Sequence, residues 1–199
     1  MLFFLPVLLG TFFQQLYNTV DAVIVGRFVG KEALAAVGGS SSQILNLLIG
    51  FFTGVTSGAA VIVAQYYGAR DAEDSSRSVH TAMILAIACG AIMTVVGILT
   101  APALLRIMET PEDTMADSIV YMRWVYMAMI PGMVYNMGSA ILRAVGDSKH
   151  PLYFLIACCL INVVLDLLFV VTFKMGVAGA AIATALSQLL SAVMICWFL

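Results

Sequence analysis

Charged residues are scarce in this sequence. Only 10% of the 199 residues are Asp, Glu, Lys or Arg, whereas 62% are hydrophobic and the mean hydropathy is +1.05. An ordinary soluble domain has about 25% charged and about 45 to 50% apolar residues. A soluble fold of this composition would expose large apolar patches, so we expect the excess to face lipid. The formal net charge of -2 is too small to indicate a nucleic-acid partner.

Patterns typical of other protein classes are also lacking. The four cysteines lie in apolar runs without a CxxC or Cys/His pattern, which argues against a disulfide framework or a zinc site. We expect no cofactor. The opening MLFFLPVLLG has no basic residue before the apolar run, unlike a signal peptide, and the run continues to about Val25. It therefore predicts a first membrane-spanning helix.

The few charges collect between long apolar stretches, as expected where about 20 apolar residues cross a bilayer. The pattern predicts six helices at about 2–25, 33–67, 79–105, 115–143, 151–173 and 177–199. They are joined by short connections at 26–31, 68–77, 106–113, 145–151 and 174–176. The expected fold is all-α and polytopic, with sequential helices antiparallel.

Proline or regularly spaced glycine residues occur within three of the predicted helices. Pro6 and Pro131 lie within the first and fourth helices, where each removes a backbone hydrogen bond and permits a bend. Gly50, Gly54 and Gly58 recur every four residues in the second helix. Small residues at that spacing let helices approach closely, so we expect this ladder to pack against another helix.

Two acidic residues, Asp21 and Asp166, lie deep inside apolar stretches, whereas the other acidic residues lie in loops or at helix ends. A carboxylate at membrane depth costs about 2.5 to 3.5 kcal/mol on insertion scales, so it usually faces a bundle interior and serves function. No Lys or Arg in the same helices offers a partner. Burial then favours the protonated form, unless a bound cation such as sodium supplies the missing charge. The alternative is a protonated group that only joins helices.

Other polar residues share helical faces with these carboxylates. Gln14, Tyr17, Asn18 and Asp21 form one stripe, Thr184, Ser187, Gln188 and Ser191 a second, Asn136, Ser139 and Arg143 a third, and Asn162 pairs with Asp166. Such faces predict a polar cavity near the membrane midplane, as in transporters. Interhelical hydrogen bonding is the alternative for the Ser and Thr residues.

Four segments in order carry a family resemblance: LYNTVDAVIVGRFVGKEALAA with Pro6 fifteen residues before Asp21, VAQYYGAR, RAVGDSKHP, and NVVLD followed by GVAGAAIATALS. With them, nearly the whole chain resembles the amino-terminal lobe of the multidrug and toxic compound extrusion (MATE) transporters. This family is related to polysaccharide and lipid exporters.

The resemblance implies a multi-pass protein of the cell membrane that exports cationic or amphipathic compounds against an inward flow of protons or sodium. It implies that cation coupling involves Asp21, Asn162, Asp166, Tyr121, Asn136 and Thr184, with sodium, if used, bound by Asp21 and Asp166. The first helix would bend at Pro6. We expect the substrate cavity to be lined by Gln14, Tyr17, Asn18 and Gln188.

The chain differs from the family pattern in its length. Family members carry two six-helix lobes in one chain, whereas the second lobe is absent here. The resemblance therefore implies a fragment, or a lobe that pairs with a carboxy-terminal lobe or a second copy. The expected partners are the lipid bilayer and an organic cation, with no nucleic acid.

Three other functions remain open. A lipid or lipid-linked oligosaccharide flippase would need a cationic cavity, whereas this one is predicted to be acidic, with Arg123 the one basic residue that argues otherwise. An intramembrane aspartyl protease is disfavoured, because Val20 rather than Tyr precedes Asp21 and Asp147 lies in AVGD rather than GxGD. We therefore expect no enzyme. An inactive half-transporter is the third alternative.

Overall fold

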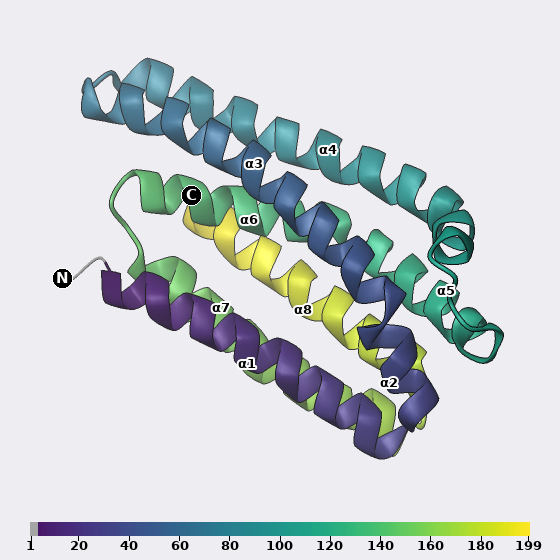
Figure 1. Ribbon diagram of the computed structural model, residues 1–199. Coiled ribbons are helices and arrows are strands. Elements are labelled where there is room, and N and C mark those ends of the chain that lie inside the picture. Colours follow the sequence, from purple (N-terminus) through teal and green to yellow (C-terminus); the bar gives the residue numbers. More distant parts are fainter. Residues whose placement is uncertain (1–3) are drawn as a thin grey trace.

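The computed structural model describes residues 4–199, and all regular structure in that range is helical. The helices are α1 (Phe4–Phe28), α2 (Lys31–Gly38), α3 (Ser40–Gly68), α4 (Ala72–Ile107), α5 (Glu112–Met127), α6 (Met129–Ala144), α7 (Lys149–Asp166) and α8 (Gly176–Phe198), with a π-helical segment, Leu167–Thr172, after α7 (Figure 1). The all-α prediction is confirmed. The predicted start of the first helix, at residue 2, lies outside the described residues.

Length and composition indicate which helices in residues 4–199 can cross a membrane. Four spans are long and apolar enough: Lys31–Gly68, Ala72–Ile107, Lys149–Thr172 and Gly176–Phe198. The pair α5 and α6 forms a fifth span that is bent by 48°. Helix α1 has 25 residues, but the polar residues in its middle, from Gln14 to Asp21, lower its hydropathy.

The helices form two pairs with α6 and α8 between them (Figure 1). Helices α3 and α4 lie side by side on one side of the bundle, and α1 lies along α7 on the other. Helix α6 packs against α3, α4 and α8, while α8 packs against α5, α6 and α7. Helices α2 and α5 gather at one end, and the α3–α4 turn and α6–α7 loop lie at the opposite end.

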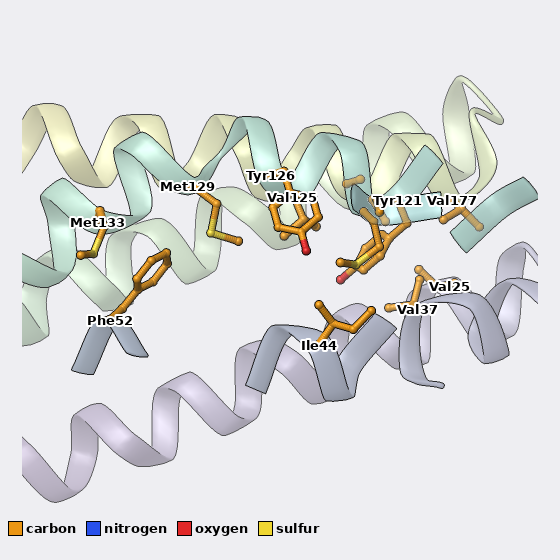
Figure 2. Packing of buried hydrophobic residues seen from close by; sticks show 14 of the residues in the cluster. Val25, Val37, Ile44, Phe52, Tyr121, Val125, Tyr126, Met129, Met133 and Val177 are labelled. Carbon is orange, nitrogen blue, oxygen red and sulfur yellow. The ribbon is translucent and has the colours of Figure 1, made fainter. Parts of the chain in front are cut away.

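Close packing in the centre depends on glycines in α4 and α6. A Cβ on Gly90 would lie 2.8 Å from Cα of Ile130, so the α4 backbone contacts that of α6 directly. Gly97 leaves room for the ring of Tyr126, and Gly138 for the side chain of Ile195. Figure 2 shows the apolar layer beside this contact, where Phe52 of α3 lies close to Met133 of α6.

The glycine ladder of the second span does not pack as predicted. A Cβ on Gly50, Gly54 or Gly58 would meet no heavy atom within 4 Å, and all three glycines are exposed. The prediction of helix packing is therefore wrong within this bundle. The contacts that need glycine involve α4 and α6 instead.

Several predicted boundaries also differ. The second span breaks at Gly39, the span 115–143 breaks at Ala128, three residues before Pro131, and the span 151–173 ends in the π-helical segment. The connection predicted at 68–77 is shorter, because Asp71 caps α4 by accepting a hydrogen bond from the backbone N–H of Asp74 (3.1 Å). The charged residues Glu73 and Asp74 lie in the first turn of α4 and not in the predicted loop.

The α6–α7 loop is held by Asp147. Its carboxylate accepts hydrogen bonds from the backbone N–H groups of Lys149 (3.1 Å) and His150 (3.2 Å) and contacts the His150 ring. The ring of His150 lies 4.2 Å from that of Phe198, at the end of α8. Partial burial raises the pKa of Asp147, but these hydrogen bonds outweigh it and hold the pKa below its usual value of 3.8.

Gly90→Ala should destabilise the protein by about 1 to 3 kcal/mol, because the added methyl group forces α4 and α6 apart. Gly54→Ala is the matched control, since its methyl group meets open space. Thermal unfolding of the detergent-solubilised variants measures the difference. Equal midpoints for the two variants would contradict the direct α4–α6 backbone contact.

Asp147→Ala should cost about 1 kcal/mol near neutral pH, through loss of the bonds at the start of α7. Since the folded protein holds the pKa of Asp147 below its usual value, this contribution is complete above about pH 4 and is lost as the pH falls through the lowered pKa. The gap in unfolding midpoint between wild type and variant should therefore narrow in acid. A gap that widens in acid would refute this role.

Candidate functional site

A cavity of about 200 Å³ lies between α1 and α3, with α5, α6 and α8 forming its remaining walls. The predicted site residues that line it are Gln14, Tyr17, Asn18, Asp21, Tyr121, Asn136, Thr184 and Gln188. The whole first stripe, Thr184 and Gln188 of the second and Asn136 of the third thus line one space, whereas Ser187, Ser191, Ser139 and Arg143 do not line it.

The carboxyl groups of Asp21 and Asp166 lie close enough to interact electrostatically, although 145 positions separate them in the sequence. Asp21 lies on the cavity wall and is 7% exposed, while Asp166 is completely buried behind it. Both oxygens of Asp166 and Oδ1 of Asp21 lack a hydrogen-bond partner among the described residues. A proton shared by the pair, or a bound cation, would satisfy these oxygens.

Two tyrosines lie near the carboxyl pair. Tyr17 and Tyr121 both interact electrostatically with Asp21 and Asp166. The hydroxyl of Tyr17 also donates to Oγ1 of Thr184 (3.2 Å), which links α1 to α8. A phenol can donate or accept a hydrogen bond, so these side chains can respond to a change of charge on the pair.

The two predicted asparagines occupy different environments. Asn162 is fully buried, and neither its Oδ1 nor its Nδ2 has a partner among the described residues. Asn136 is exposed to the cavity and donates from Nδ2 to the backbone oxygen of Gly132 (2.8 Å). The buried amide of Asn162 therefore has unmet hydrogen-bonding capacity, whereas the amide of Asn136 already donates one hydrogen bond within its own helix.

No group of three or more His, Cys, Asp or Glu side chains in residues 4–199 could hold a metal ion. A sodium ion at Asp21 and Asp166 would need further oxygen ligands, such as amide or hydroxyl groups, because hard cations prefer oxygen. Pro6 lies in the first turn of α1, and its bending role stays a prediction.

The chain turns π-helical directly after Asp166, over Leu167–Thr172. Such segments are rare and frequently mark functional sites. Helix α8 packs closely there, since a Cβ on Gly179 would lie 3.1 Å from the backbone of Phe169. No feature of the apolar run LLFVVT distinguishes this segment from an ordinary helix in the sequence.

Sequence reasoning missed the apolar side of the cavity. Leu45, Ile49 and Phe52 line it from α3, and Val125 and Met129 from α5 and α6. Their spacing of three to four residues on α3 places them on one face, which could have been recognised. The cavity therefore has the carboxylate of Asp21 on one wall and apolar side chains on another.

The family model MatE matches residues 6–168. The chain belongs to the MATE family. It is 35% identical over 192 residues to the probable multidrug resistance protein YoeA of Bacillus subtilis, covering 94% of this chain and 41% of YoeA. It is 32% identical over 187 residues to the probable multidrug resistance protein YpnP of the same organism, covering 94% of this chain and 42% of YpnP.

Solved MATE structures share the fold. An outward-facing multidrug resistance MATE transporter of the MOP superfamily matches with a TM-score of 0.91 and 29% identity, over 98% of this chain and 43% of that one. The chain spans about two fifths of the length of the curated relatives it matches. The resemblance to one lobe of a two-lobe MATE transporter, in the cell membrane, is confirmed.

Asn162→Leu should leave the unfolding midpoint unchanged or raise it, because the replacement removes two buried polar atoms without partners. Thr184→Val should lower the midpoint, since it leaves the Tyr17 hydroxyl without its hydrogen bond. Thermal unfolding of both variants provides the test. A midpoint several degrees lower for Asn162→Leu would mean that its amide has a partner.

Proposed function

We propose that this MATE lobe is part of a secondary antiporter that exports amphipathic organic cations, with Asp21 and Asp166 as the ion-coupling groups. The observation that carries the proposal is the carboxyl pair, with Asp21 on the cavity wall and Asp166 buried next to it. Within residues 4–199 neither carboxyl forms an ion pair, and three of the four carboxyl oxygens are buried without a hydrogen-bond partner. Substrate and coupling ion would compete for the same negative charge. Competition of this kind makes entry of one drive release of the other.

The names given to the related proteins support the export role. YoeA and YpnP are described as probable multidrug resistance proteins, and the matched structure as a multidrug resistance transporter. The proton is the coupling ion that we favour, because one proton shared between two buried carboxyls removes a charge and supplies the missing donor. Sodium is the alternative, with ligands from the same pair.

The proposed binding mode has two parts. The amine of the substrate lies toward Asp21, while its apolar part contacts Phe52 and Met129 across the cavity. Protonation of the carboxyl pair removes the attraction for the amine and releases the substrate. Tyr17 and Tyr121 interact electrostatically with both carboxyl groups and would respond to the change of charge.

Asp21→Asn and Asp166→Asn should each abolish coupled export, while leaving membrane insertion intact because a charge is removed from the bilayer. Efflux of a fluorescent organic cation from right-side-out membrane vesicles, driven in turn by an inward proton gradient and an inward sodium gradient, measures coupling. Asp117→Asn, in α5 and outside the cavity lining, is the matched control.

Retained gradient-driven efflux in both Asp21→Asn and Asp166→Asn would refute the coupling role. The gradient that drives efflux in the wild type identifies the ion. The vesicles should contain the assembled transporter, with its second lobe, because the lobe described here supplies only part of the pathway of its relatives.

A further inference from the structure

A groove of about 380 Å³ lies between α3 and α4, the two helices that run side by side in Figure 1. Its floor is apolar, with Ala59 and Ile62 from α3 and Ala82 and Leu85 from α4. The short side chains of the two alanines leave room between the helices, while Ile62 and Leu85 are exposed. This α3–α4 groove shares no lining residue with the cavity that contains Asp21.

Charged and polar side chains line the end of the groove nearer the α3–α4 turn. Arg77 and Asp74 lie there near the start of α4, and Tyr66 near the end of α3. Arg77 forms an ion pair with Glu73 (2.8 Å), which does not line the groove. The carboxylate of Asp74 lies 3.8 Å from Arg77, too far for a hydrogen bond. This end of the groove therefore has charges of both signs with unused hydrogen-bonding capacity.

The groove runs from the level of the lipid headgroups into the hydrocarbon. Residues 78–105 of α4 contain no Asp, Glu, Lys or Arg and form a helix about 42 Å long, enough to cross a hydrocarbon core of about 30 Å. Arg77 and Asp74 precede this stretch, and Tyr66 is of the residue type that collects at membrane interfaces. Leu85 lies eight residues after Arg77, which places it about 12 Å deeper.

The charges at this end of the groove discriminate between phospholipids. Residues 70–77 contain two arginines and three carboxylates, and thus a net charge of -1, which disfavours an anionic lipid. A zwitterionic headgroup matches both signs, because its phosphate can bind the guanidinium of Arg77 and its ammonium the carboxylate of Asp74. The primary ammonium of an ethanolamine headgroup also donates hydrogen bonds to a carboxylate, whereas choline has no N–H group.

We propose that the α3–α4 groove binds a phosphatidylethanolamine molecule of the bilayer, with the lipid phosphate at Arg77, its ammonium at Asp74 and one acyl chain along the apolar floor. The hydroxyl of Ser78 lines the same end and offers the phosphate a further donor. The acyl chain covers the exposed side chains of Ile62 and Leu85. The site is separate from the export cavity, so it does not depend on the proposed function.

Quenching of a tryptophan placed in the groove shows which lipid occupies it. The assembled transporter that contains this lobe is reconstituted into an equal mixture of phosphatidylethanolamine, phosphatidylcholine and phosphatidylglycerol, of which one at a time carries brominated acyl chains. Leu85→Trp places the reporter on the groove floor. Leu99→Trp, on the same helix and 75% exposed outside the groove, is the matched control. Fluorescence of the protein without either substitution is subtracted.

Leu85→Trp should report phosphatidylethanolamine about threefold more often than phosphatidylcholine, as expected for an exposed charge-assisted contact, and phosphatidylglycerol least often. Leu99→Trp should report the three lipids equally. Asp74→Asn should remove the preference for phosphatidylethanolamine over phosphatidylcholine, whereas Asp113→Asn, in the first turn of α5, should keep it. Arg77→Gln should let brominated diacylglycerol, which lacks the phosphate, compete about threefold better.

Equal quenching by phosphatidylethanolamine and phosphatidylcholine in Leu85→Trp, or strongest quenching by phosphatidylglycerol, would overturn the proposal. A preference that persists in Asp74→Asn, or that Leu99→Trp reports equally, would also overturn it, because the preference would then belong to the protein surface in general. An unchanged share of diacylglycerol in Arg77→Gln would refute the phosphate contact. Ile62→Trp, on the α3 wall, is the second reporter and should give the same order of lipids.

Discussion

Polar groups buried in a membrane protein must find partners inside the protein, and the rest of this structure depends on how the Asp21–Asp166 pair meets that requirement. Lipid offers no hydrogen bonds, so two carboxyl groups can lie at depth only if helices enclose them. Helices α1, α7 and α8 provide the enclosure, and the Tyr17–Thr184 hydrogen bond ties two of them together. The pair remains under-satisfied, which leaves it ready to take up a proton or a cation.

The two halves of the bundle differ in how firmly they are fixed. Direct backbone contact at Gly90 and Ile130 joins α4 to α6, and such contacts allow little sliding. On the other side, polar atoms without partners and a π-helical segment surround the carboxyl pair. A rigid frame beside a region with unsatisfied groups is a suitable arrangement for a lobe in which ion binding changes local structure.

Much of this architecture could be predicted from the sequence. Apolar runs defined the spans, and the spacing of Gln14, Asn18 and Asp21 placed them correctly on a common cavity wall. The breaks at Gly39 and Ala128 and the π-helical segment were missed, because they depend on tertiary packing rather than local pattern. The predicted packing of the glycine ladder around Gly54 was wrong for a related reason. The spacing of the glycines shows that another helix could approach closely, but not whether a neighbouring helix is present.

The open face of α3 has a consequence for packing in the membrane. Gly50, Gly54 and Gly58 are exposed and leave gaps in side-chain volume between exposed apolar side chains such as Leu47 and Phe51. Small residues at this spacing let a neighbouring helix approach closely. The same three glycines that find no neighbour within this bundle therefore leave a shallow depression along α3 that acyl chains or another helix can fill.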